Sequence, residues 1–183
     1  ELAERMALLR SHGITREPEK MTQSPDGPWY YQQIDLGFNY RMTELQAALG
    51  LSQLQRLDAY VAKRHEIARW YNEHLTDLPL KLPWQHPTGY SAYHLYVVRL
   101  NIDDCEVGHK AVFEALRQQG IGVNLHYIPV PRQPYYAKAG HDMRELSESD
   151  QYYAEAISLP MYPTLDVVQL HKVGREIWKA LSG

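Results

Sequence analysis

The stretch LGFNYRMTELQAALGLSQLQRLD, residues 36–58, decides the fold because an extended segment runs directly into a helix. Thr43 and Gln46 have the spacing of a capping box, in which a hydroxyl and an amide satisfy backbone groups at the helix start. Apolar residues at helical spacing continue to Leu75, which predicts one helix from Thr43 to about Leu75. At 1.5 Å per residue it would span about 45–50 Å, so we expect it to link two bodies.

The segment upstream of this helix has less regular structure. Leu2, Met6 and Leu9 predict a short helix that ends at Gly13, where glycine tolerates a left-handed conformation. Residues 14–42 follow no period, and a loop of this length in a compact domain is usually functional or disordered. Because disordered segments avoid aromatic residues, we expect the second half to dock through its aromatic side chains, which are Trp29, Tyr30, Tyr31, Phe38 and Tyr40.

The segment downstream of the helix indicates a compact α+β domain. Prolines at 79, 83 and 87 predict an extended connector. Residue types and turn signals then predict strands at 93–100, 121–127 and 158–161. Helices are expected to begin at Asp103 or Asp104, at Ser147 and at Thr164.

Composition limits the classes of function. Hydrophobic residues make up 44% of the 183 residues and charged residues 22%, as in a globular protein. The formal net charge of −3 and the scattered basic residues do not favour nucleic acid as a partner. No apolar run is long enough for a membrane span, and the single cysteine, Cys105, suits a reducing cytoplasm. The chain begins at Glu1 inside a predicted helix, so we expect further residues upstream.

The histidines do not predict a metal site. His65-Glu66 begins like a zinc-protease motif, but Arg69 occupies the place of the second histidine. The remaining histidines have no ligand spacing, and the ordinary interpretation is surface or hydrogen-bonded histidines.

The first candidate site is Asn39 and Arg41. Side chains alternate in an extended segment, so these two point the same way. An amide and a guanidinium suit a phosphate group, and the following helix N-terminus adds a favourable dipole. An aromatic staple with a solvated arginine is the alternative, and spacing alone favours it slightly.

The second candidate site follows the predicted strand at 121–127, which breaks into prolines. His126 and Tyr127 stand at the break and are able to donate to a hydroxyl or carbonyl oxygen. Gln133, Tyr135 and Tyr136 follow, and tyrosines combine polar tips with apolar bodies. A strand end with a half-buried aromatic residue is an equally good interpretation.

Four motifs in order give a resemblance to a known family: residues 36–58, HLYVVRL, GIGVNLHYIPVPRQPYY and AISLPMYPTL. Together they resemble the DegT/StrS-type nucleotide-sugar aminotransferases over essentially the whole chain. The branch that makes 4-amino-4,6-dideoxy sugars in pseudaminic-acid-type pathways is the most similar. The resemblance implies the C-terminal portion of a type-I pyridoxal-phosphate (PLP) aminotransferase fold, of class α/β. It divides the chain into the end of the cofactor domain (1–42), the linking helix (43–78) and a small α+β domain with a mainly antiparallel sheet (79–183).

The resemblance also implies the chemistry. The whole protein would be a cytoplasmic homodimer that binds pyridoxal 5'-phosphate and moves an amino group from glutamate to a UDP-linked keto-sugar for surface polysaccharide. Asn39 and Arg41 would contact the cofactor of the partner subunit. The sugar pocket would be lined by His126, Tyr127, Gln133 and Tyr136.

Two departures from the family pattern matter. The lysine that attaches the cofactor stands in a Ser-His-x-x-Lys context, and no lysine of this chain has that context. We expect it upstream of Glu1, so the chain alone would be inactive. Pro131-Arg132 stands where the pseudaminic branch often has His-Leu, which leaves the sugar open. The alternatives are a nucleotide-sugar-binding module without catalysis, and a structural fragment produced by truncation.

Overall fold

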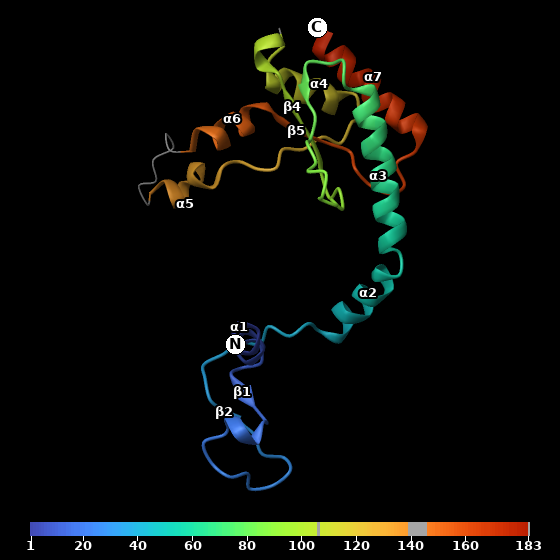
Figure 1. The fold of residues 1–183 in the computed structure, drawn as a ribbon. Coiled ribbons are helices and arrows are strands. Elements are labelled where there is room, and N and C mark those ends of the chain that lie inside the picture. Colours follow the sequence, from blue (N-terminus) through green and yellow to red (C-terminus); the bar gives the residue numbers. More distant parts are fainter. Residues whose placement is uncertain (106, 139–145, 183) are drawn as a thin grey trace. The chain divides into compact units, whose positions relative to one another are not determined.

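The computed structural model describes residues 1–105, 107–138 and 146–182. Internal contacts divide the chain into two units, Glu1–Gln55 and Arg56–Gly183. Figure 1 colours the first unit blue to cyan and the second unit cyan-green to red.

The first unit is a short helix, a two-stranded ribbon and a second helix. α1 (Leu2–Arg10) leads into β1 (Ile14–Thr15), a 3₁₀ turn follows at η1 (Pro18–Lys20), and β2 (Gln32–Gln33) pairs antiparallel with β1. α1 ends at Arg10, three residues before the predicted end, whereas the left-handed conformation expected of Gly13 is confirmed by its φ of 69°. A Cβ there would collide with the carbonyl of Asp35, so both the conformation and the close approach require glycine.

The helix from Thr43 is shorter than predicted. The capping box is confirmed, since Gln46 N–H donates to Thr43 Oγ1 at 3.3 Å and Thr43 N–H donates to Gln46 Oε1 at 2.9 Å. The single helix to Leu75 is wrong, because α2 (Glu44–Leu54) ends before α3 (Leu57–His74) begins. Neither Gln55 nor Arg56 is a helix breaker, so composition gives no signal for this interruption.

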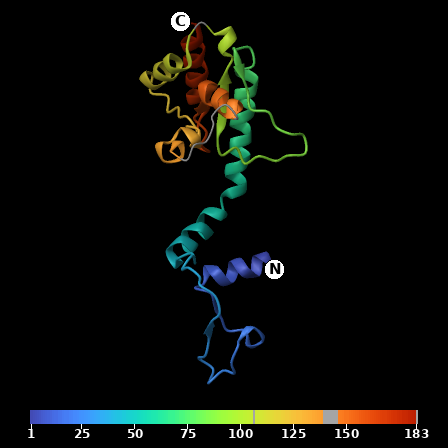
Figure 2. The ribbon, with the colours of Figure 1, turned by 90° about the vertical axis from the view of Figure 1, so that its left-hand side faces the viewer.

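The second unit is a three-stranded antiparallel sheet with helices. The strand order is β3 (Leu80–Lys81), β4 (Tyr96–Leu100), β5 (Ala156–Leu159), with Tyr96 opposite Leu159. α4 (His109–Gln118) and α7 (Val167–Ser182) pack against each other and α3 packs on α7, as Figures 1 and 2 show beside the sheet. The remaining elements are η2 (Ile102–Asp104), η3 (Val130–Arg132), α5 (Pro134–Ala137) and α6 (Ser147–Glu155).

The hydrophobic core belongs to the second unit. β4 alternates buried and half-buried residues, whereas all four residues of β5 are buried. α3 contributes Ile67 and Tyr71, and α7 contributes Leu170, Val173 and Ile177 at helical spacing. Within the described residues, every buried apolar side chain of the core lies at Ile67 or later. The antiparallel sheet expected for the fold class is confirmed.

Three predicted elements are wrong in detail. Residues 121–127 form only a single bridge, between Asn124 and Ser158, because the segment turns where Val123 N–H donates to the Ile121 carbonyl. Asp103 and Asp104 lie in η2, and α4 begins only after Gly108. Thr164 does not cap α7; Asp166 and Gln169 exchange two hydrogen bonds of 2.8 and 3.0 Å there.

None of the helices in the described ranges is long and apolar enough to cross a membrane. The same ranges contain no group of three or more His, Cys, Asp or Glu side chains that could hold a metal ion.

Candidate functional site

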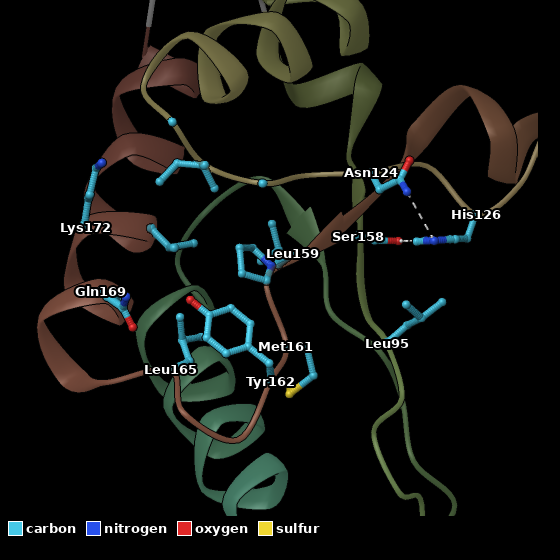
Figure 3. A pocket seen from close by; sticks show the side chains of 15 residues that line it. Leu95, Asn124, His126, Ser158, Leu159, Met161, Tyr162, Leu165, Gln169 and Lys172 are labelled. Atoms are coloured by element: carbon cyan, nitrogen blue, oxygen red, sulfur yellow. Dashed lines mark hydrogen bonds between the residues drawn. The ribbon is translucent and has the colours of Figure 1, made fainter. Parts of the chain in front are cut away.

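A cavity of about 430 Å³ lies in the second unit at one end of the sheet (Figure 3). Its wall is made by the segment after α4, the end of β5 with the loop that follows, and one face of α7. Its lining combines apolar side chains with a few polar ones, which is the usual composition of a small-molecule site. Its polar side chains are Asn124, His126, Ser158, Tyr162, Gln169 and Lys172.

Asn124, His126 and Ser158 form one end of the cavity. Ser158 lies on β5, is only 3% exposed and exchanges two backbone hydrogen bonds with Asn124, of 2.8 and 3.2 Å. Its Oγ lies 2.8 Å from Nδ1 of His126. Asn124 Nδ2 lies 3.5 Å from Nε2 of the same ring. Both ring nitrogens of His126 therefore face protein groups in this structure.

Gln169 and Lys172, on α7, lie at the opposite end in Figure 3. Gly120 follows the end of α4 and adopts a φ of 73°. Lys172 Nζ lies 3.8 Å from the position that a Cβ on Gly120 would occupy. This end therefore combines a cation with exposed backbone, whereas the other end is uncharged when His126 is neutral.

Two side chains of α3 donate hydrogen bonds to backbone carbonyls of the loop that lines the cavity after β5. The Tyr71 hydroxyl donates to the Pro160 carbonyl at 2.9 Å. Arg64 Nη1 donates to the carbonyls of Met161 and Tyr93, at 2.9 and 2.8 Å. Burial raises the pKa of Tyr71, so its hydroxyl stays protonated and a donor. The loop after β5 is thus fixed to α3.

Of the four predicted sugar-pocket residues, only His126 lines this cavity. Tyr127 is 73% exposed and lines a separate shallow hollow with Glu148 and Tyr152. Gln133 and Tyr136 are exposed at the start of α5, where the Gln133 carbonyl accepts from Tyr136 N–H. The placement of these three residues in a sugar pocket remains a prediction.

Asn39 and Arg41 belong to the first unit, and both side chains are exposed. Asn39 pairs with Ser11 in a backbone bridge, and Tyr40 N–H donates to the Arg10 carbonyl at 2.9 Å. Arg41 borders a hollow that Gln46 of α2 also lines. The bridge at Asn39 fixes the backbone, while its amide and the guanidinium of Arg41 make no side-chain hydrogen bond within the described residues. Both groups fit an anion such as a phosphate.

Sequence comparison decides the family. The profile of the DegT/DnrJ/EryC1/StrS aminotransferase family matches residues 1–177. The chain belongs to this family. It is 36% identical over 185 residues to the spore coat polysaccharide biosynthesis protein SpsC of Bacillus subtilis, covering 98% of the chain and 47% of SpsC. It is 30% identical to the UDP-4-amino-4,6-dideoxy-N-acetyl-beta-L-altrosamine transaminase of Campylobacter jejuni, covering 91% of the chain and 42% of that protein.

Solved structures agree with this assignment. PseC of Helicobacter pylori, an aminotransferase of pseudaminic acid biosynthesis, matches with a TM-score of 0.80 and 27% identity, over 99% of the chain and 46% of PseC. The family is PLP-dependent, and a neighbour in fold, Spr1654 of Streptococcus pneumoniae, has been solved in PLP and PMP forms. The aminotransferase fold expected from the sequence is confirmed. The chain spans about half the length of the relatives it matches.

The sequence interpretation missed several lining residues. Asn124 stood inside the quoted motif, and Ser158 stood in a predicted strand, but neither was given a role. A pairing between these two positions has no local signature, because they are 34 residues apart. Lys172 and Gln169 share one helical face of α7, which spacing alone does not separate from an ordinary solvated face.

Proposed function

We propose that the chain is part of a pyridoxal-phosphate-dependent transaminase that moves an amino group from glutamate to a UDP-linked keto-sugar. Family membership over residues 1–177 carries the proposal. The names of the Bacillus and Campylobacter relatives support polysaccharide biosynthesis and a UDP-linked amino sugar. The glutamate donor is the expectation from family resemblance.

Asn39 and Arg41 are the residues that would hold the phosphate of the cofactor. Their amide and guanidinium are exposed, and they precede the capped N-terminus of α2, whose dipole favours an anion. When bound, the cofactor supplies the electron sink for transfer of the amino group. This chain's own contribution is to bind and orient the phosphate and, through His126, to contact the sugar.

We propose that the whole protein acts as a cytoplasmic homodimer. The first unit exposes a run of large apolar side chains, which supports a covering partner. These side chains are Leu36, Phe38, Tyr40, Met42, Leu45, Leu49, Leu51 and Leu54, each at least 56% exposed. A second subunit, in which Asn39 and Arg41 reach the neighbouring cofactor, would cover them.

Variants of Asn39 and Arg41 in the longer protein that contains this chain test the proposal. Arg41→Ala and Asn39→Ala should each weaken PLP binding, because a hydrogen bond to a charged group contributes about 1.5–3 kcal/mol. Arg69→Ala is the control, since Arg69 is an exposed cation on α3. PLP titration followed by absorbance measures the change. Wild-type affinity in both variants would remove the pair from the cofactor site.

We also propose that the chain by itself has no transaminase activity, because none of its lysines has the Ser-His-x-x-Lys context. Transaminase activity of the isolated 183-residue chain, lost on replacing one of its lysines, would contradict this.

Nucleotide-sugar binding without catalysis is a second candidate, favoured by the cavity with Asn124 and His126 at one end. Calorimetry of the isolated chain with UDP-N-acetylglucosamine tests it. Absence of binding heat at millimolar ligand would reject it.

A further inference from the structure

The ring of His126 lies between two side chains, Asn124 and Ser158, each of which faces one ring nitrogen. Leu125 N–H donates to Asn124 Oδ1 at 2.8 Å, which determines how the Asn124 amide is turned. The amide NH₂ is therefore the group that faces Nε2 of His126, at 3.5 Å. On the other side of the ring, Ser158 Oγ lies 2.8 Å from Nδ1.

This arrangement selects one tautomer. An NH₂ group only donates, so its position beside Nε2 favours the tautomer in which that nitrogen carries the lone pair. In a neutral imidazole the proton then sits on Nδ1, and Ser158 Oγ accepts it. Ser158 is 3% exposed and its backbone is bonded in both directions to Asn124, so its hydroxyl has a fixed position.

We propose that Ser158 is a positioning residue that holds His126 with Nδ1 protonated, so that Nε2 accepts a hydrogen bond from a hydroxyl group of the sugar. The proposal rests on the proposed function, in which His126 contacts the sugar. At 3.5 Å the Asn124 contact is long for a hydrogen bond, and a ligand hydroxyl at normal distance replaces it at little cost. The site therefore selects a hydroxyl donor over a carbonyl acceptor at this position.

The geometry of the cavity agrees with this direction of approach. Figure 3 shows Asn124, His126 and Ser158 grouped at one end with Leu95 beside them, and the side chains of Leu159 and Leu165 on the way to α7. A sugar ring combines an apolar face with hydroxyl groups on its edge, and such a ring would lie against these leucines with one hydroxyl directed to Nε2.

A double-mutant cycle in the longer protein tests the inference. The probe is UDP-4-amino-4,6-dideoxy-N-acetyl-β-L-altrosamine with 2-oxoglutarate, in the reverse transaminase direction. Ser158→Ala should lower kcat/KM by about five- to tenfold, the scale of one lost hydrogen bond. In a His126→Ala background the same change should have no further effect, because its only route is through the ring. Ser158→Thr keeps the hydroxyl and should retain most activity, and Ser91→Ala controls for removal of a hydroxyl elsewhere.

The outcomes separate the two proposals. An equal loss in both backgrounds would overturn the inference, since Ser158 would then act through the fold alone. A loss in His126→Ala with full activity in Ser158→Ala would overturn the inference and leave the proposed function standing. Full activity in His126→Ala would overturn the inference together with the sugar contact of His126, while the transaminase activity, which rests on family membership, would stand.

A spectroscopic readout decides the question even if Ser158→Ala does not fold. In ¹⁵N-histidine-labelled wild-type protein, two-bond nitrogen–proton correlations identify which ring nitrogen carries the proton. The His126 signal, assigned by its loss in His126→Gln, should report a proton on Nδ1. A proton on Nε2 at neutral pH would overturn the proposal.

Discussion

Arg99 and Glu155 form an ion pair in the second unit, in which Nη2 and Nε of Arg99 lie 2.7 and 2.8 Å from Oε2 of Glu155. The Glu155 carboxylate is only 3% exposed. Its other oxygen accepts from Gln151 Nε2 at 2.8 Å, and Lys81 Nζ lies 3.9 Å from Oε2. The pair thus joins β4 to the end of α6, immediately before the cavity-lining strand β5.

Replacing the cation of this pair, Arg99, should lower the free energy of unfolding. Arg99→Met leaves a buried carboxylate without its main partner, which typically costs about 3–5 kcal/mol of unfolding free energy. Urea unfolding of the chain measures the change. Lys110→Met is the matched control, because the Lys110–Glu114 pair on α4 is exposed and should contribute less than about 0.5 kcal/mol. Equal effects in the two variants would contradict the structural role of the buried pair.

Stability should fall in acid because of the same carboxylate. Burial acts to raise the pKa of Glu155, but hydrogen bonds from Gln151 and Arg99 and the charges of Arg99 and Lys81 outweigh it, so its pKa lies below the ordinary 4.5. A lowered folded-state pKa contributes stability above the unfolded value, and this is lost as the pH falls through the folded value. Urea midpoints between pH 6 and pH 3 should therefore fall less steeply in Glu155→Gln than in wild type. If the urea midpoints of Glu155→Gln and wild type fell equally with pH, Glu155 would not be the source of the acid sensitivity.

The Tyr71 hydroxyl should stabilise the loop that follows β5. Tyr71→Phe removes the donor to the Pro160 carbonyl and should cost about 1–2 kcal/mol of unfolding free energy. Tyr162→Phe is the control, since that ring is 41% exposed and loses no hydrogen bond given by the structure. Chemical denaturation of both variants is the measurement, and a neutral Tyr71→Phe would show that water replaces the bond.

The Thr43 cap should stabilise α2 locally. Thr43→Ala removes the acceptor of Gln46 N–H and should cost about 1 kcal/mol of helix stability, whereas Thr43→Ser retains the oxygen. Amide hydrogen exchange at Gln46 should be faster in Thr43→Ala by a factor that corresponds to this energy. Unchanged exchange would mean that the helix start is held by other contacts.

Features with local chemical causes were predictable from the sequence. The Thr43–Gln46 capping box, the left-handed glycine at 13 and β4 follow from residue type and spacing, and the structure has them. The type of fold and the family came from motif order rather than from periodicity.

Features that depend on distant partners were not predictable. The segment after Gly120 has strand-like composition, but within the part of the chain that the structure describes its one β-bridge is that of Asn124 with Ser158. The same long-range pairing places Ser158 beside His126, which explains why the sequence named the histidine and missed the serine. Nothing in residues 55–56 marks the interruption between α2 and α3.

The location of the buried apolar core from Ile67 onward has a calorimetric consequence. The heat-capacity increment of unfolding scales with the apolar surface newly exposed to water. A scan of the isolated chain should therefore give one endotherm that belongs to residues from 56 onward, while residues 1–55 lose their order without a peak of their own. A partner that covers the exposed side chains of α2 should increase the heat-capacity increment of unfolding, because more apolar surface is then exposed when the assembly unfolds. The size of this increment therefore reports whether the assembly has formed.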